Sequence, residues 1–478
     1  MFRTSETRNG VPDVTGPLET DEVPMAPDDK LDDPKKQLDR RSFLTYGAAA
    51  GAGLMMSGMA PAKAAAAVRQ SGDINVALLG AGAQGQILMT SCLKIPGLSF
   101  KAVCDIWTDF NQKRTVGLLN RYGHEVTGYV DYREMLAQER DLDAVIIATP
   151  DFWHAEHTIA CLRQGLHVYC EKEMSNTLAD ARRMVLAARE TGKLLQIGHQ
   201  RRSNPRYIHS RERLIRDAQI LGRITTINAQ WNRSVQPDLG WPQKWAIPQA
   251  VLSRYGFDSM HQFRNWRWYR GLGGGPIVDL GSHQIDIFGW FLDAVPQSVV
   301  ASGGLDYYDP ATHEWYDTVM AIFEFPGDQG LVRAFYQTLT TNSNQGYYES
   351  FMGDQGTLFI TESAGRGGVY REQSAPDWSR WVELGYVNAP EEEEVSLDES
   401  LVLDVRETLA PPQYRIPVEF NDPYHMPHLV NFFNAVRGEE ELNCPAEVGY
   451  ESAVAVLKVN EAVETGRKLT FRPSEFRV

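Results

Sequence analysis

The chain of 478 residues has only five cysteines, an odd number that forms no C-x-x-C pair. A disulfide framework and a zinc ribbon both require paired or regularly spaced cysteines, so the sequence favours neither. We expect all five to be buried thiols: Cys92, Cys104, Cys161, Cys170 and Cys444.

Positive charge is also scarce, because 47 Lys and Arg face 62 Asp and Glu and give a formal net charge of −15. An acidic chain is poorly suited to binding nucleic acid or an anionic lipid surface. The sequence has no internal repeat of about 20 to 50 residues, which argues against a solenoid or propeller. Its 43% hydrophobic and 23% charged residues are typical of a soluble globular protein, here long enough for two or three domains of roughly 150 residues.

The N-terminal region carries a targeting pattern rather than a folding pattern. Residues 1–38 hold 5 Lys or Arg against 9 Asp or Glu and little to bury, which predicts a disordered extension. Residues 39–64 contain Arg40-Arg41, then an uncharged stretch of small residues, then Ala62-Lys63-Ala64, an A-x-A cleavage pattern. This segment resembles a twin-arginine signal peptide, so we expect a periplasmic or otherwise exported protein that uses the twin-arginine translocation machinery. An uncleaved membrane anchor, or a chance Arg-Arg before an Ala-rich linker, is the alternative.

The folded part opens with a strand, a glycine turn and a helix. Ile74 to Leu79 is apolar and rich in branched residues, Gly80-x-Gly82-x-x-Gly85 follows, and residues 86–93 are helical in pattern. Gly80 permits a tight turn, Gly82 lets the backbone approach a pyrophosphate, and Gly85 lets the helix pack closely on the strand. The helix N-terminus would offer unpaired N–H groups to the phosphates.

A second strand, residues 100–104, ends at Asp105. A carboxylate at this position accepts hydrogen bonds from an adenosine ribose and repels a 2′-phosphate, which favours NAD over NADP. In the alternative interpretation, the glycines form only a tight turn and Asp105 only caps the next helix.

Further strands alternate with helices and predict a doubly wound parallel sheet. We expect strands at 144–148, 167–170 and 194–197, and helices at 155–164 and 178–190. Ligands of such sheets bind at the carboxyl ends of the strands, so one crevice should be faced by Asp105, Thr149, His154, Glu171 and Lys172.

After Gly198 the pattern changes to an open, largely antiparallel sheet, with strands expected at 224–229, 318–325, 331–336 and 357–360. Residues 231–270 are rich in Trp and Arg, which suits either a sugar-binding surface or the cover of a helix or subunit contact. The acidic run Glu391 to Glu394 indicates a solvated loop. The final helices, from about His428 to Thr465, should pack back on the body.

A second polar group follows the glycine run at residues 273–275. Helical spacing places Asp279, His283 and Asp286 on one face. They could form a proton-transfer pair, a metal site or a buried network; a metal is disfavoured because no second histidine lies at ligand spacing.

These motifs, in this order, resemble those of the Gfo/Idh/MocA family, which includes glucose–fructose oxidoreductase and inositol dehydrogenase. The resemblance implies a Rossmann domain at 73–198, a C-terminal α/β domain for substrate binding and oligomerisation at 199–478, a nicotinamide cofactor and a sugar or polyol substrate. It implies that Lys172 contacts nicotinamide and substrate and that Asp279 and His283 are the acid/base pair. The residues expected at the dinucleotide are Gly80, Gly82, Gln84, Gly85, Asp105, Thr149, Pro150, His154, Glu171 and Lys172.

The chain departs from the family at one place, where Glu173 stands instead of the usual proline after Glu171-Lys172. We expect an exported NAD(P)-dependent oxidoreductase that acts on a CH–OH group, with tightly bound cofactor, no catalytic metal, and self-association through the C-terminal sheet. An NAD-dependent glycoside-cleaving enzyme, which oxidises its sugar transiently and then eliminates, and a non-catalytic sugar-binding relative are the alternatives.

The signal interpretation makes a direct prediction. Replacing Arg40 and Arg41 together by Lys should trap the precursor in the cytoplasm, because the pathway reads the arginine pair itself. Fractionation and immunoblotting would measure this, and an unchanged periplasmic yield of the double variant would contradict it.

Overall fold

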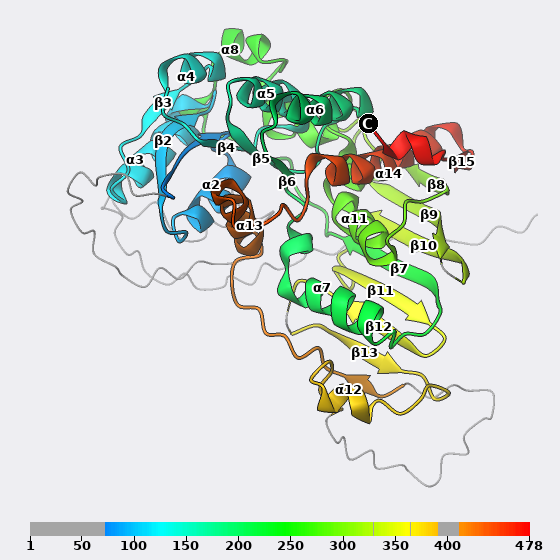
Figure 1. Cartoon of the computed structure of the whole chain (residues 1–478). Coiled ribbons are helices and arrows are strands. Elements are labelled where there is room, and N and C mark those ends of the chain that lie inside the picture. Colours follow the sequence, from blue (N-terminus) through cyan, green and yellow to red (C-terminus); the bar gives the residue numbers. More distant parts are fainter. Residues whose placement is uncertain (1–71, 328, 364, 391–410) are drawn as a thin grey trace, which may run out of the picture. The chain divides into compact units, whose positions relative to one another are not determined.

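A computed structural model describes residues 72–327, 329–363, 365–390 and 411–478. The expected disordered extension, the signal segment and the acidic run at 391–394 all lie outside these residues. The described chain forms two sheets with their helices (Figure 1). None of the described helices is both long and apolar enough to cross a membrane.

The first sheet is parallel throughout and has six strands in the order β3-β2-β1-β4-β5-β6. Its strands are β1 (Ile74–Leu79), β2 (Leu98–Cys104), β3 (Thr127–Tyr129), β4 (Ala144–Ile147), β5 (His167–Cys170) and β6 (Leu195–Ile197). The doubly wound sheet is confirmed, and strands β1 and β5 have the predicted bounds. The sequence analysis missed β3 because its three residues, TGY, carry no apolar run and two of them are exposed.

Helices cover both faces of the first sheet. They are α2 (Ala83–Cys92), α3 (Lys113–Arg121), α4 (Tyr132–Gln138), α5 (Asp151–Arg163) and α6 (Leu178–Thr191). α6 begins at a capping threonine, since the Thr177 side chain accepts a hydrogen bond from the Asp180 N–H, and it ends at the left-handed Gly192.

The second sheet has nine strands in the order β14-β13-β12-β11-β7-β10-β9-β8-β15. They are β7 (Ile224–Asn232), β8 (Ser298–Gly304), β9 (Thr318–Gly327), β10 (Gly330–Leu339), β11 (Tyr347–Gly353), β12 (Gly356–Ile360), β13 (Gly367–Arg371), β14 (Gln413–Tyr414) and β15 (Leu469–Thr470). The pairing is antiparallel except between β7 and β10, which confirms an open, largely antiparallel sheet.

The remaining helices follow the first domain in sequence. They are α7 (Pro205–His209), α8 (Gln249–Arg254), α9 (Met260–Arg264), α10 (Gly275–Asp279), α11 (Gly281–Leu292), α12 (Ser379–Glu383), α13 (Met426–Arg437) and α14 (Ala446–Thr465). Short 3-10 or π turns lie at η1 (Thr108–Gln112), η2 (Gln200–Ser203), η3 (Ser210–Asp217), η4 (Gln243–Trp245), η5 (Trp266–Trp268) and η6 (Pro473–Phe476).

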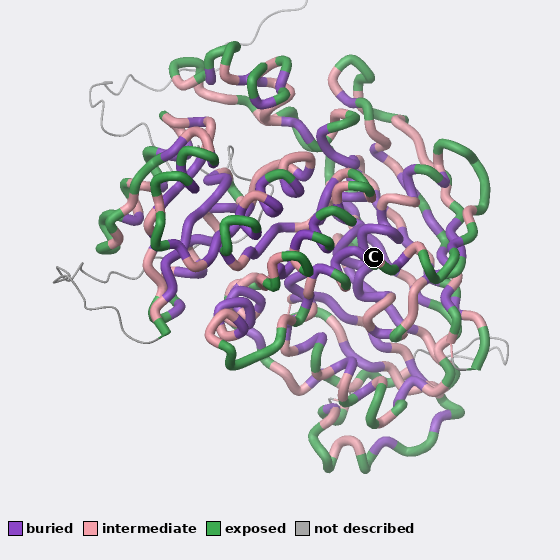
Figure 2. Tube along the Cα trace, turned by 45° about the horizontal axis from the view of Figure 1, so that its top comes forward, coloured by how far each residue is buried: buried purple, intermediate pink, exposed green. Residues whose placement is uncertain are grey.

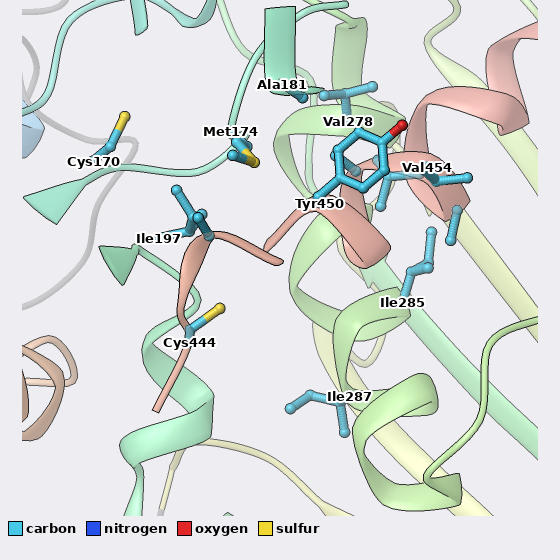
Figure 3. Packing of buried hydrophobic residues seen from close by; sticks show 14 of the residues in the cluster. Cys170, Met174, Ala181, Ile197, Val278, Ile285, Ile287, Cys444, Tyr450 and Val454 are labelled. Carbon is cyan, nitrogen blue, oxygen red and sulfur yellow. The ribbon is translucent and has the colours of Figure 1, made fainter. Parts of the chain in front are cut away.

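The hydrophobic core joins the two sheets. One cluster includes Cys170 and Ile197 from the first sheet together with Ile285 from α11 and Val454 from α14, as Figure 3 shows. Buried residues concentrate in the strands and in the helices between the sheets, while exposed ones lie mostly in outer turns (Figure 2). All five cysteines are buried and free, as predicted.

Helix α13 belongs in space to the first sheet, although it follows the second in sequence. Its Met426, Leu429, Phe432 and Phe433 share one buried cluster with residues of β1 and α2. The chain thus returns from its C-terminal region to complete the first core.

The glycine turn after β1 is tightly packed. Gly80 has a φ of +86°, and a Cβ on it would lie 2.6 Å from the Ala148 carbonyl oxygen. A Cβ on Gly85 would lie 1.9 Å from the Gly80 carbonyl oxygen, closer than atoms can approach. Gly82 differs, because its φ is −69° and a Cβ there would meet nothing within 4 Å.

These two glycines give a matched pair of variants. Gly85→Ala should lower the free energy of unfolding by about 1–3 kcal/mol, since the helix must move off the strand. Gly82→Ala should change it by less than about 1 kcal/mol. Urea unfolding of the cofactor-free proteins would measure both, and equal effects at the two positions would contradict the described packing.

Candidate active site

The glycine turn fits a dinucleotide pyrophosphate. It leads into α2, a helix of 10 residues whose first turn carries no acidic residue. Gly82, at the N-cap position, provides no side chain to accept hydrogen bonds from the first N–H groups of the helix. The free space around Gly82 leaves room for phosphate oxygens against the backbone. The turn therefore meets the requirements of the expected cofactor.

Asp105 ties the end of β2 to this turn. Its carboxylate accepts hydrogen bonds from the Ala81 N–H at 2.7 Å, the Trp107 N–H at 2.7 Å and the Asn111 side-chain amide at 3.2 Å. Burial raises the pKa of Asp105 to about 6, although these three donors oppose the rise. Asp105 thus holds the loop in shape, and its contact with a ribose remains a prediction.

The residues after β4 differ from one another in their access to the crevice. Thr149 and Pro150 lie at the start of α5, and the Thr149 hydroxyl is 3.0 Å from His157 Nδ1. His154 is 1% exposed and lies between the carbonyl oxygens of Thr149 and Glu173, at 2.7 and 2.8 Å. Burial lowers its pKa to about 4. His154 therefore joins the loops after β4 and β5 from inside the protein, rather than facing an open crevice as expected.

Glu171 and Lys172 follow β5, as predicted. The Gln84 amide donates a hydrogen bond to Glu171 Oε1 at 3.0 Å and lies 2.9 Å from His425 Nε2. Lys172 Nζ donates to the Asp279 carbonyl oxygen at 2.5 Å and lies 3.5 Å from Asp279 Oδ1. The first domain and the C-terminal domain therefore meet at this lysine.

Asp279 is the anion at the centre of three cations. Arg267 Nε donates to Oδ1 at 2.9 Å, Lys172 lies 3.5 Å from Oδ1, and Arg233 lies 3.9 Å from Oδ2. Burial alone would raise the pKa of Asp279, but these cations lower it below its usual range. Asp279 is thus ionised.

His283 lies beside this group. It is 8% exposed, its ring centre is 5.4 Å from that of Trp231, and its buried Nδ1 has no hydrogen-bond partner in the described part of the chain. Burial and the nearby Lys172 charge lower its pKa well below the usual value, so the imidazole is neutral at neutral pH. The carboxylate of Asp279, the residue expected to form the acid/base pair with His283, contacts the three cations.

The prediction that Asp279, His283 and Asp286 lie on one face of a single helix is wrong. The helix breaks at Leu280, because α10 ends at Asp279 and α11 begins at Gly281. Asp286 shares α11 with His283, but its carboxylate accepts hydrogen bonds from Arg202 at 2.8–3.0 Å and from Ser452 at 2.5 Å. Across the described ranges, no group of three or more His, Cys, Asp or Glu could hold a metal ion.

The sequence analysis missed a buried ion network that packs against Trp231, a neighbour of His283. Arg201 is 1% exposed and pairs with Glu349 and with Glu362, the latter at 3.2 Å. Its guanidinium also lies over the rings of Trp231 at 5.6 Å and Tyr347 at 5.3 Å. His199, two residues before it, is 1% exposed with neither ring nitrogen hydrogen-bonded within the described residues. Both follow the carboxyl end of β6, so the rule that located Lys172 could have located them.

Residues 241–272, here called the aromatic strap, cross the carboxyl ends of first-sheet strands. Trp107 Nε1 donates to the Trp245 carbonyl at 2.5 Å, and Trp153 Nε1 donates to the Tyr255 carbonyl at 3.1 Å. Arg254 pairs with Asp131 just after β3 at 2.7 Å. The aromatic residues of the strap therefore cover the first domain, which favours the covering role among the two expected for this segment.

Glu173, the departure from the family pattern, is buried at 1% exposure. Its Oε1 accepts the Met174 N–H at 2.8 Å, while Oε2 has no partner among the described residues. The peptide bond between Lys172 and Glu173 is cis. Burial raises the pKa of Glu173 to about 8, so the carboxyl is largely protonated at neutral pH.

This carboxyl makes stability depend on pH. Its folded pKa of about 8 lies above the unfolded value of 4.5, so the folded state binds the proton more tightly and stability falls as pH rises between these values. Glu173→Gln removes that loss, and its advantage over the wild type should grow to about 1–4 kcal/mol by about pH 9. Urea unfolding across this range would measure it, with exposed Glu190→Gln as the control. An advantage of Glu173→Gln that does not change with pH would contradict the assignment.

Comparison with known proteins agrees with the geometry. The model "Oxidoreductase family, NAD-binding Rossmann fold" matches residues 74–199, and "Oxidoreductase family, C-terminal alpha/beta domain" matches residues 217–471, both of the Gfo/Idh/MocA group. The chain is 32% identical over 243 residues to 1,5-anhydro-D-fructose reductase of Ensifer adhaerens, covering 50% of this chain and 62% of that one. It thus spans less than two thirds of that relative.

Two further similarities extend over most of the chain. D-glucoside 3-dehydrogenase of Escherichia coli (strain K12) is 25% identical over 415 residues, covering 84% of this chain and 98% of that one. The structure of aldose-aldose oxidoreductase from Caulobacter crescentus, complexed with glycerol, superposes with a TM-score of 0.62 at 20% identity, covering 84% of this chain and all of that one. The resemblance inferred from the motifs is confirmed, and the chain belongs to the Gfo/Idh/MocA oxidoreductase family.

Proposed function

We propose that this protein is an exported oxidoreductase that removes a hydride from a CH–OH carbon of a sugar or polyol, with a tightly held NAD. The observation that carries the proposal is the meeting of Lys172, Asp279 and neutral His283 beside a glycine turn that fits a dinucleotide. The named relatives act on sugars or sugar derivatives as dehydrogenases or reductases. None of them is named as a glycosidase, so the glycoside-cleaving alternative is not proposed.

The bound nicotinamide would accept the hydride, and the residues of the chain would handle the proton. As the C–H bond breaks, the hydroxyl on the same carbon must lose its proton, which leaves a carbonyl. His283, neutral because burial and Lys172 lower its pKa, is the group able to take that proton. Lys172 would stabilise the negative charge that develops on the oxygen, and Asp279 would hold Lys172 in place.

Two features support NAD and its tight retention. NAD is favoured because Asp105 stands at the end of β2, where a carboxylate would repel a 2′-phosphate. The aromatic strap contacts Trp107, two residues after Asp105, and so covers the side of the crevice where the adenosine is expected. A cofactor enclosed in this way suits a protein that leaves the cytoplasm folded and without access to free NAD.

The exposed face of the second sheet supports self-association. Val300, Met320 and Ile322 are exposed by 39%, 42% and 41% on strands β8 and β9, where Val300 pairs with Ile322. A second copy placed on this face would bury them. Ile322→Glu should then shift the protein to monomer in light scattering, and an unchanged mass would contradict this arrangement.

The experiment that tests the function uses the purified protein. Nucleotide released on denaturation should be NAD, and the retained nucleotide should become reduced when members of a sugar and polyol panel are added. Protein that carries no dinucleotide and binds none when it is added would contradict the proposal, and release of NADP would contradict the role of Asp105.

Variants of the two catalytic residues test the chemistry. Lys172→Ala and His283→Ala should each retain nucleotide and lose roughly 10²-fold or more in turnover. Because the pKa of His283 is lowered, the acid limb of the wild-type kcat/KM profile should lie below the usual histidine value of about 6.5. Near-normal turnover of His283→Ala would transfer the base role to Lys172, and near-normal turnover of both variants would contradict the site.

A further inference from the structure

Of the three cations around Asp279, Lys172 and Arg267 donate side-chain hydrogen bonds to it. The side chain of Arg233 donates none to the described residues. Its backbone N–H donates to the Leu339 carbonyl at 2.8 Å at the end of β7. Its guanidinium lies 3.9 Å from Asp279 Oδ2 and 5.2 Å from the centre of the Trp231 ring. Arg267, in contrast, donates a 2.9 Å hydrogen bond to the same carboxylate.

The packing of Trp231 fixes the position of Arg233. Trp231 precedes it by two residues in an extended segment, so both side chains leave the chain on the same side. Trp231 is itself packed against His283 and against Tyr347, its partner on β11. The guanidinium is therefore held next to the base, with its side chain 31% exposed.

Arg233 shares its nearest carboxylate with two other cations. Lys172, Arg233 and Arg267 surround the single Asp279 carboxylate. Two further acids, Glu171 and Asp151, act on Arg267, whereas among the described residues Asp279 is the one carboxylate that acts on Arg233. Partial burial of the Arg233 side chain lowers its pKa, because the loss of hydration outweighs the attraction of Asp279. An anion bound at Arg233 would replace the lost water with hydrogen-bond acceptors and supply the opposite charge.

We infer that the substrate carries a carboxylate, and that Arg233 binds it. A guanidinium presents a planar fork of N–H donors that matches a carboxylate in a bidentate pair, and such charge-assisted hydrogen bonds are among the strongest in proteins. The substrate class is thus an acidic sugar or polyol, a uronate or an aldonate, oriented with its carboxylate at Arg233 and the reacting CH–OH at His283 and Lys172. This inference rests on the proposed function for the identity of the reacting centre.

Matched substrate pairs test the inference on the NAD-loaded protein. Glucuronate is compared with glucose, galacturonate with galactose, and gluconate with sorbitol, by reduction of the bound nucleotide; glucose 6-phosphate tests a phosphate as the source of the anion. The wild type should prefer the acid of at least one pair by about 10- to 100-fold in kcat/KM, the range expected for a charge-assisted hydrogen bond. Preference for the phosphate over every acid, or for the neutral member of every pair, would overturn the inference.

Two variants assign the preference to Arg233. Arg233→Gln should lower kcat/KM for the preferred acid at least about 10-fold more than for its neutral partner, mainly through KM, and Arg233→Lys should retain part of the preference. Arg333→Gln is the control, because Arg333 lies on the neighbouring strand β10 at a similar 3.8 Å from a carboxylate, that of Glu324. An equal loss for acid and neutral substrate in Arg233→Gln would show that Arg233 serves only the Asp279 group.

Equilibrium binding separates this inference from the proposed function. Calorimetric titration of the NAD-loaded protein with the same acids and neutral sugars needs no turnover. If no compound reduces the nucleotide but an acid binds in the wild type and not in Arg233→Gln, the function fails and the carboxylate site stands. If acid and neutral compounds bind equally, or if none of the acids binds, the carboxylate site is overturned whatever the activity.

Discussion

One carboxylate joins the parts from which the site is built. Asp279 at the end of α10 pairs with Lys172 after β5, with Arg267 in the aromatic strap and with Arg233 after β7. These groups come from the first domain, the strap and the second sheet, so their geometry depends on a single anion being ionised. Its three cations ensure this, because together they outweigh the burial that would otherwise protonate it.

A second ion network, separate from the group around Asp279, is buried. Arg201 pairs with Glu349 and Glu362, and its guanidinium lies over the rings of Trp231 and Tyr347. A buried network of this kind adds little net stability, because desolvation of the charges offsets their attraction. The network acts on geometry instead. The paired Arg201 guanidinium packs against Trp231 and Tyr347 and so helps to hold these neighbours of His283 in place.

Much of the fold and part of the site follow from local sequence patterns. The apolar runs at Ile74 to Leu79 and at His167 to Cys170 are strands with the expected bounds, because a strand buried on both faces is apolar at every position. The glycine spacing located the turn before α2, and position after a buried strand located Lys172. Both signals come from neighbouring residues.

What local patterns missed depends on distant residues. Arg233 and Arg267 approach Asp279 only after β7 and the strap are placed, and the 33 residues between them carry no periodic pattern that would predict this approach. The helix break at Leu280 separates Asp279 from His283 and Asp286, and Asp286 pairs with Arg202, a partner 84 residues away. Helical spacing alone could not anticipate either outcome, because it assumes an unbroken helix and says nothing of partners.

The return of α13 to the first sheet bears on when the protein can fold during synthesis. The first domain ends near residue 199, yet a large part of its second core comes from Met426, Leu429, Phe432 and Phe433. A ribosome adds about 5–20 residues per second, so this apolar face of β1 and α2 waits on the order of 10–50 s for its cover. During that interval the domain is incomplete and open to aggregation, and the last tenth or so of translation decides whether it closes.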